Sequence, residues 1–158
     1  MKNFLIKRNR FTFFLIGIFA LFSTSLIFNF CTMFVENKEG SSLMDGTTGL
    51  FKQFVYAGIL APLLETLLFQ HFIYIVLKKF IHKEKILIFT YIISSSILFS
   101  LEHKYSTYYI FVTFFMGIVL GFSYYISTLR KESGYWNTAI IHGLYNSLLV
   151  LISSLFLK

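Results

Sequence analysis

The sequence has little charge, one cysteine and one proline. Only 13% of its 158 residues are charged, whereas 56% are hydrophobic and the mean hydropathy is +0.72. Such a composition excludes an ordinary soluble globular domain. The single cysteine, Cys31, excludes an intrachain disulfide, and because it lies in an apolar stretch we expect it to be a packing residue. The composition predicts an integral membrane protein.

The charge that is present is mostly basic, with 14 Lys and Arg against 7 Asp and Glu and a net charge of +7. A basic balance can indicate nucleic-acid binding when it forms one continuous face. Here the basic residues flank apolar runs instead. We therefore expect no nucleic-acid partner, and a lipid bilayer as the surroundings of the chain.

Five apolar stretches are long enough to cross a bilayer, which takes about 20 helical residues. They occupy residues 11–35, 51–77, 86–103, 107–128 and 136–157. The pattern predicts an all-α protein, a multi-pass transmembrane helical bundle with about five transmembrane helices. The start of the chain resembles a secretory signal peptide, but the run from Phe11 to Phe30 has membrane-spanning length and is more typical of a signal anchor.

One polar, glycine-bearing segment, residues 36–49, separates the first span from the others. It predicts two regions: residues 1–50, with an N-terminal cytoplasmic segment, the first transmembrane helix and the polar loop, and residues 51–158, a four-helix membrane core. Basic residues are retained on the cytoplasmic side of a membrane. They gather before the first span, between the second and third, and between the fourth and fifth, at positions 2, 7, 8, 10, 78, 79, 83, 85, 130 and 131. This alternation predicts a cell-membrane protein with a cytoplasmic N-terminus.

Glu65 is the most informative polar residue, because it lies near the middle of the second apolar stretch. A charged side chain at that depth costs about 2.5–3.5 kcal/mol on insertion scales, so it usually faces a cavity or a partner. A buried carboxylate suits general-base work on water, and it equally suits a hydrogen bond between helices. Pro62, three residues earlier, frees backbone carbonyls and kinks the helix, which predicts a water-accessible pocket near Glu65.

Two further pairs of side chains share a helical face. His142 and Asn146 are four residues apart in the last span, so both can address one ligand atom, for example an oxyanion, or can form an interhelical polar clasp. His103 follows Phe99 by four residues at the end of the third span, where a solvated histidine is the ordinary alternative. His71 and His82 are weaker candidates.

Taken in order, the segments APLLETLLFQ, FSLEH, FMGIVLGFSYY and WNTAIIHGLYN resemble the CPBP family of intramembrane proteases, the CAAX-protease and bacteriocin-processing family. The pattern of that family is two adjacent glutamates with an arginine four residues after the second, then Phe-xxx-His, then His-xxx-Asn. The resemblance implies a peptidase in which Glu65 activates water while His103, His142 and Asn146 stabilise the tetrahedral intermediate. A peptide or membrane protein is the implied substrate.

The chain departs from this pattern at two positions, with Thr66 in place of the second glutamate and Gln70 in place of the arginine. An i, i+4 ion pair is thus replaced by two neutral groups, which we expect to hydrogen-bond to each other. We expect no cofactor, because no HExxH pair is present. Zinc stays an alternative, since one Glu and two His can bind it with an open position.

Three functions remain open from the sequence. The first is an intramembrane peptidase. The second is a catalytically inactive membrane scaffold or bacteriocin-immunity protein of the same fold, which the neutral residues Thr66 and Gln70 favour. The third is a small transporter or channel, because polar residues at membrane depth also mark transport pathways.

Overall fold

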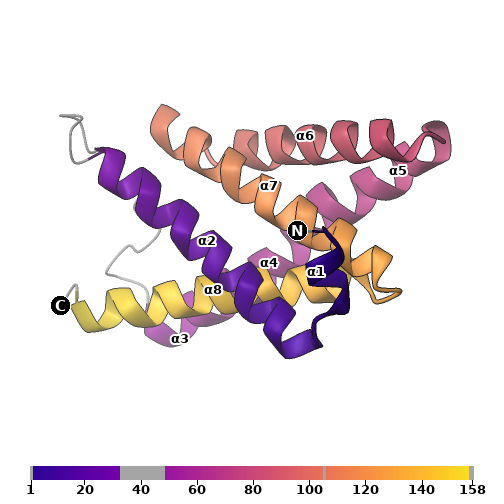
Figure 1. The fold of residues 1–158 in the computed structure, drawn as a ribbon. Helices are drawn as coiled ribbons and strands as arrows, with labels where there is room; N and C mark the ends of the chain where they lie inside the picture. Colours follow the sequence, from indigo (N-terminus) through magenta and orange to yellow (C-terminus); the bar gives the residue numbers. More distant parts are fainter. Residues whose placement is uncertain (1, 33–48, 105, 157–158) are drawn as a thin grey trace.

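The computed structural model describes residues 2–32, 49–104 and 106–156, and within these ranges every regular element is a helix (Figure 1). The elements are α1 (Lys2–Lys7), α2 (Arg10–Thr32), α3 (Leu50–Gln53), η1 (Phe54–Leu60), α4 (Ala61–Glu65), η2 (Thr66–Phe72), α5 (Ile73–Phe80), α6 (Glu84–Glu102), α7 (Thr107–Leu129) and α8 (Gly134–Phe156). The segments η1 and η2 are π-helical. Apart from Gly49, the predicted polar loop over 36–49 lies outside the described residues.

Five helical stretches in the described part of the chain are long and apolar enough to cross a membrane. They are Arg10–Phe28, Leu50–Phe80, Glu84–Glu102, Thr107–Leu129 and Gly134–Leu155. The predicted all-α bundle with about five spans is therefore confirmed, with span ends that differ from the prediction by a few residues.

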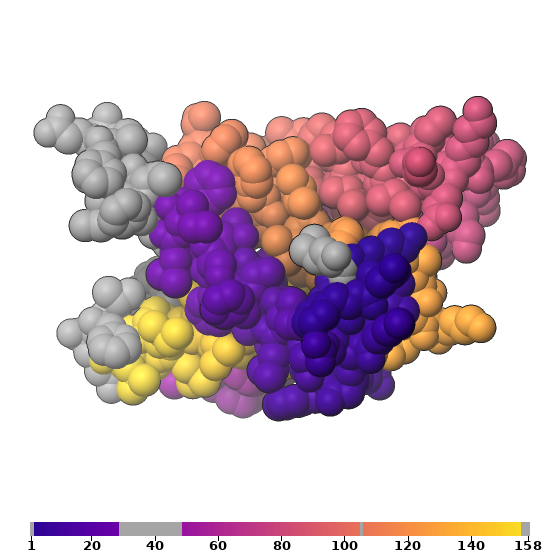
Figure 2. All heavy atoms as spheres, viewed as in Figure 1, coloured from indigo at the N-terminus to yellow at the C-terminus, as the bar shows by residue number. Residues whose placement is uncertain are grey.

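The span α7 is the centre of the bundle, because it is the most buried of the five and packs against α2, α6, α8 and η2. The helix α2 crosses both α7 and α8, and α1 packs on α7. Figure 2 shows α1 and α2 lying across one face of the molecule. The N-terminal helices are thus part of the packed bundle.

The outside of the bundle is apolar and parts of its inside are polar. Several phenylalanines are largely exposed: Phe11, Phe19, Phe51, Phe80 and Phe89. Fully buried positions include polar residues of four spans: Thr66, Gln70, Ser95, Ser127 and Thr138. This distribution suits a lipid environment, in which exposed apolar surface has no cost and the polar groups turn inward.

The second span is one continuous helix from α3 to α5, and its two π segments flank the short helix α4 that contains Pro62. Its buried residues recur at steps of four: Gly58, Pro62, Thr66, Gln70 and Tyr74. In a regular α-helix such a stripe turns by about 40° per step, and so by about 160° over four steps. The wider π turns counteract this drift. They keep the stripe facing the bundle.

Pro62 also explains one contact between the second and last spans. Ala61 donates its amide to the Tyr56 carbonyl oxygen, five residues back. The next bond of that ladder would join residue 62 to Ala57, but proline has no amide hydrogen. Instead, Asn146 Nδ2 donates to the Ala57 carbonyl oxygen at 2.9 Å. The predicted freeing of a backbone carbonyl by Pro62 is therefore confirmed, and α8 satisfies that carbonyl.

Two glycines allow close helix contacts. A Cβ at Gly143 would lie 2.7 Å from the carbonyl oxygen of Gly58, so α8 and η1 meet backbone to backbone. A Cβ at Gly117 would lie 2.8 Å from the Cα of Ser96, so α6 and α7 also approach closely there. At Gly121 the nearest heavy atom is 3.8 Å away, an ordinary contact.

The three basic segments meet at one end of the bundle. Arg130 Nη1 donates to the carbonyl oxygens of Leu5 at 2.8 Å and Arg8 at 2.7 Å, and so closes the C-terminal end of α1. Its Nη2 pairs with Glu132 Oε1 at 2.9 Å. Lys2 Nζ lies 3.2 Å from a carboxylate oxygen of Glu84. We did not expect a helix over Lys2–Lys7 from the sequence.

A buried asparagine links these contacts to the last span. Asn137 Oδ1 accepts from Arg10 Nη2 at 2.7 Å, and its Nδ2 donates to Glu132 Oε2 at 2.6 Å. The hydrogen bond from Arg130, together with that from Asn137, lowers the pKa of Glu132, although partial burial opposes the shift. A charged network therefore ties the turn between α7 and α8 to α1 and α2.

Candidate active site

Glu65 ends α4, and its side chain faces α8. Its Oε2 lies 3.7 Å from Nε2 of His142. The His142 side chain is 6% exposed and that of Glu65 is 21% exposed, so a carboxylate and an imidazole meet inside the bundle with a partial opening at the carboxylate. The close packing of Gly143 on Gly58 brings the two helices near enough for this contact.

Asn146 joins this pair from one turn further along α8. Its Nδ2 lies 3.4 Å from His142 Nε2, while one of its two amide hydrogens is donated to the Ala57 carbonyl oxygen. The second amide hydrogen is left for another acceptor. The structure thus brings three of the predicted site residues, Glu65, His142 and Asn146, into one cluster.

His103 is adjacent to this cluster through an aromatic ring. Its ring centroid lies 4.5 Å from that of Phe99, and Phe99 lies 5.8 Å from His142 on its other side. The row of three rings links the end of α6 to the middle of α8. The structure does not place His103 in direct contact with His142 or Glu65.

The tautomer of His103 follows from its hydrogen bond. Its Nδ1 lies 2.7 Å from the Phe99 carbonyl oxygen, which can only accept, so Nδ1 carries the proton. Burial lowers the pKa of His103, which favours the neutral ring. In that form Nε2 is an acceptor. A neutral His103 therefore accepts a hydrogen bond and does not donate one to an oxyanion.

Thr66 and Gln70 are both fully buried on the inner stripe of the second span. The expectation that they hydrogen-bond to each other is wrong: Thr66 Oγ1 and both polar atoms of Gln70 have no partner within the described residues. Both residues lie on the inner stripe, so the reason lies in side-chain length: the Thr66 hydroxyl is attached directly to Cβ and does not reach the Gln70 amide one turn away.

His71 is a polar residue whose surroundings the sequence did not reveal. Its Nδ1 lies 2.8 Å from the hydroxyl of Tyr124, and its ring also packs on Tyr135. Tyr124 in turn packs on Tyr74 and on the fully buried Tyr91. The density of tyrosines inside predicted spans was the available signal for this cluster, which lies on the basic side of Glu65.

Metal binding depends on how the donor side chains are grouped. Within the described ranges, no three His, Cys, Asp or Glu side chains are grouped to hold a metal ion. Glu65 and His142 supply two donors of the right types, without a third beside them. The described residues therefore do not form a zinc site of the ordinary kind, and the expectation of no cofactor stays a prediction.

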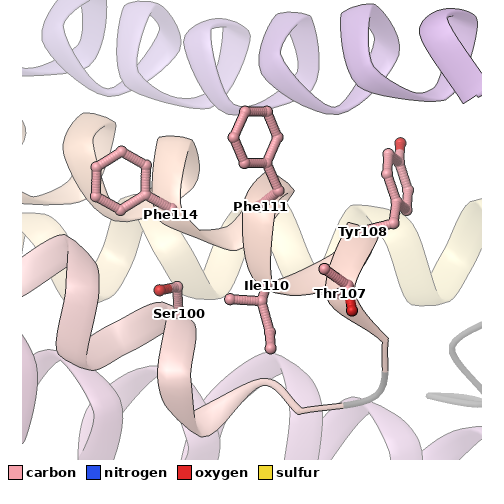
Figure 3. Close-up of a pocket in the computed structure, with 6 residues that line it drawn as sticks. All are labelled: Ser100, Thr107, Tyr108, Ile110, Phe111 and Phe114. Carbon is pink, nitrogen blue, oxygen red and sulfur yellow. The ribbon is translucent and has the colours of Figure 1, made fainter.

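A pocket lies away from the Glu65–His142 pair. It has a volume of about 490 Å³ and is lined by Ser100, Thr107, Tyr108, Ile110, Phe111 and Phe114. Figure 3 shows that Ser100 comes from α6 and the other five residues from α7. Ser100 precedes His103 by one turn, so this apolar pocket opens near the His103 side of the ring row.

Comparison with known families identifies the family of this chain. The family described as type II CAAX prenyl endopeptidase Rce1-like matches residues 47–148. The chain belongs to the Rce1-like family. The match contains every predicted site residue and confirms the resemblance to CPBP proteases. Membership of the Rce1-like family and the five apolar spans together indicate that the chain is an integral membrane protein. Neither the curated proteins nor the solved structures gave a match.

Proposed function

We propose that the chain is an intramembrane endopeptidase that hydrolyses a peptide bond in or near the bilayer. The observation that carries the proposal is the buried contact of Glu65 with His142, 3.7 Å apart, with Asn146 beside it. Membership of the Rce1-like family supports the same reaction class. A peptide or a membrane protein is the substrate class.

In this proposal Glu65 is the general base. A water oxygen can lie about 2.8 Å from both Glu65 Oε2 and His142 Nε2, because 3.7 Å is short enough for one apex to reach both atoms. The water oxygen attacks the carbonyl carbon of the substrate while its proton passes to the carboxylate. The same proton then goes to the amine that leaves.

His142 and Asn146 supply the oxyanion site. Their nitrogens are 3.4 Å apart, so the Nε2 hydrogen of one tautomer of His142 and the second Nδ2 hydrogen of Asn146 can converge on one oxygen. The bond from Asn146 to Ala57 fixes the amide in place before substrate arrives. Because a neutral His103 accepts at Nε2, we assign it a hydrogen bond from the leaving amine and no part in oxyanion binding.

The test is cleavage of candidate peptides by protein reconstituted in liposomes. We expect Glu65→Gln to lower kcat by about 10²–10⁴-fold and Asn146→Ala by about 10²–10³-fold. The exposed His82→Gln variant, which lies outside the cluster, is the matched control for His142→Gln. Unchanged cleavage by Glu65→Gln and His142→Gln would exclude the mechanism.

The second candidate is a non-catalytic scaffold or bacteriocin-immunity protein of the same family. The neutral pair Thr66 and Gln70 favours it, since both charges of the family pattern are missing. A cellular phenotype that survives Glu65→Gln, with the protein inserted and folded, would support this function over proteolysis.

We also propose that the basic end of the bundle faces the cytoplasm in the cell membrane. The three basic segments meet there through Arg130, Lys2 and their partners, and basic residues are retained on the cytoplasmic side. Fusion of a reporter to the N-terminus tests this orientation. If only a reporter that requires export from the cytoplasm were active there, the proposed orientation would be refuted.

A further inference from the structure

Several buried side chains carry polar atoms that have no hydrogen-bond partner in the part of the chain that the structure describes, and four of them are serine, threonine or glutamine side chains. We call these four the inner polar cluster: Thr66, Gln70, Ser95 and Thr138. All four are 0% exposed. They come from three different helices, η2, α6 and α8, and η2 packs against both of the others.

Several other hydroxyls in the spans behave differently. Ser96, Thr113 and Ser127, for example, donate to the carbonyl oxygen four residues earlier, at 2.6, 2.8 and 2.9 Å. This back-bonding is the usual way in which a helical serine or threonine is satisfied in an apolar environment. Thr66 Oγ1 does not make this bond, and neither do the hydroxyls of Ser95 and Thr138. Their polar atoms are left for another partner.

The helix registers place the cluster at one level of the bundle. Two ring contacts align the second span with α6: Phe69 on Phe99 at 6.0 Å and Tyr74 on Tyr91 at 5.1 Å. Gln70 and Ser95 both lie between these contacts. On α8, Thr138 precedes His142 by one turn, just as Thr66 and Gln70 follow Glu65 toward the basic end. The cluster therefore adjoins the Glu65–His142 pair.

The cost of leaving these atoms unsatisfied is large. Each buried polar group without a partner costs about 1–3 kcal/mol, and Gln70 alone presents both an amide donor and a carbonyl acceptor. Buried water is the usual remedy, since one molecule typically makes about three hydrogen bonds to otherwise unsatisfied groups. The cluster offers donors and acceptors from three directions, as such a water requires.

We propose that the inner polar cluster is a binding site for water inside the bundle, directly on the basic side of Glu65 and His142. The Gln70 amide and the Thr66 hydroxyl bind water at positions where the family pattern has an arginine and a glutamate, which would bind each other. Because the site adjoins Glu65, it can also supply water to the general base, and this catalytic role rests on the proposed function. The water site itself does not.

The experiment detects water at Gln70 directly. The chain contains two glutamines, Gln53 and Gln70, so ¹⁵N-glutamine labelling gives two side-chain amide signals in perdeuterated lipid. We expect water-edited solid-state NMR to show magnetisation transfer from water to both, with Gln53, which is partly exposed near the start of the second span, as the positive control. Transfer to Gln53 without transfer to Gln70 would overturn the proposal.

Matched variants separate a bound water from a dry, unsatisfied cluster. Thr66→Val keeps the shape and removes one hydroxyl, and Thr113→Val is the control because the hydroxyl of Thr113 is already back-bonded. We expect Thr66→Val to weaken the water signal at Gln70 and to lower Tm by about 2–4 °C, and Thr113→Val to leave the Gln70 signal unchanged. A rise in Tm in Thr66→Val would show that the hydroxyl was dry, and would refute the site.

The NMR and cleavage measurements together distinguish the two proposals. The NMR measurement needs no substrate, and we expect the water signal at Gln70 to persist in Glu65→Gln. If that variant still cleaves peptides, the peptidase mechanism fails while the water site stands. If cleavage depends on Glu65 but Gln70 shows no water contact, only the water site fails. When both hold, Gln70→Met should lower kcat at unchanged KM, an effect that a purely structural role would not produce.

Discussion

Replacing Gly143 with alanine tests the contact that holds α8 against η1. The added Cβ would lie 2.7 Å from the carbonyl oxygen of Gly58, whereas ordinary contacts begin at 3.4 Å. The two backbones must therefore separate by about 0.7 Å, the difference between these distances. The same shift would lengthen the bond from Asn146 to Ala57, now 2.9 Å, to about 3.6 Å, which is outside hydrogen-bond range.

The expected cost combines three contributions. Overpacking of a tight contact costs about 1–3 kcal/mol, and the lost hydrogen bond about 1 kcal/mol. The higher helix propensity of alanine returns about 0.5–1 kcal/mol. We expect Gly143→Ala to lower the free energy of unfolding by about 2 kcal/mol. Since Asn146 loses its anchor, we also expect kcat to fall in molecules that remain folded.

Gly121→Ala is the matched control, because its Cβ would meet its nearest heavy atom at 3.8 Å. We expect this variant to be as stable as the unsubstituted protein or more stable by up to about 1 kcal/mol. Unfolding in mixed detergent micelles, followed by circular dichroism, measures both. Equal stability of the two variants would refute the backbone contact between Gly143 and Gly58 as the origin of the site geometry.

Hydropathy was sufficient to predict the spans, because lipid demands long apolar helices whatever their packing partners. It could not predict α1, whose six residues are too few for a span. That helix depends on Arg130, a residue more than 120 positions away that closes the end of α1. Local sequence carries no sign of such a distant contact.

Helical periodicity predicted which site residues share a face, but not how the faces meet. The pairing of Glu65 with His142 depends on the close approach of Gly143 to Gly58 and on π turns, which shift residues relative to an α-helical register. The expected bond between Thr66 and Gln70 failed because the short Thr66 side chain does not reach Gln70, although both residues share a face. The sequence also places His103 at the end of its span, but its tautomer depends on the position of the Phe99 carbonyl oxygen, which periodicity does not give.

Two remaining predictions concern charge. Thr66→Glu and Gln70→Arg each place one unpaired charge on the buried stripe, so each alone should lower the free energy of unfolding by about 3–5 kcal/mol. The double variant should recover most of that loss. Additive losses in a double-mutant cycle would show that the two positions do not pair. Glu132→Gln removes the carboxylate that pairs with Arg130 and accepts from Asn137, and should cost about 1.5 kcal/mol at pH 7. Because the folded-state pKa of Glu132 is lowered, its contribution is present above the ordinary carboxyl pKa of 4.5 and lost as pH falls through the folded value. The stabilities of the Glu132→Gln and unsubstituted proteins should therefore converge in acid, and a difference that persists at low pH would assign the effect to packing instead of charge.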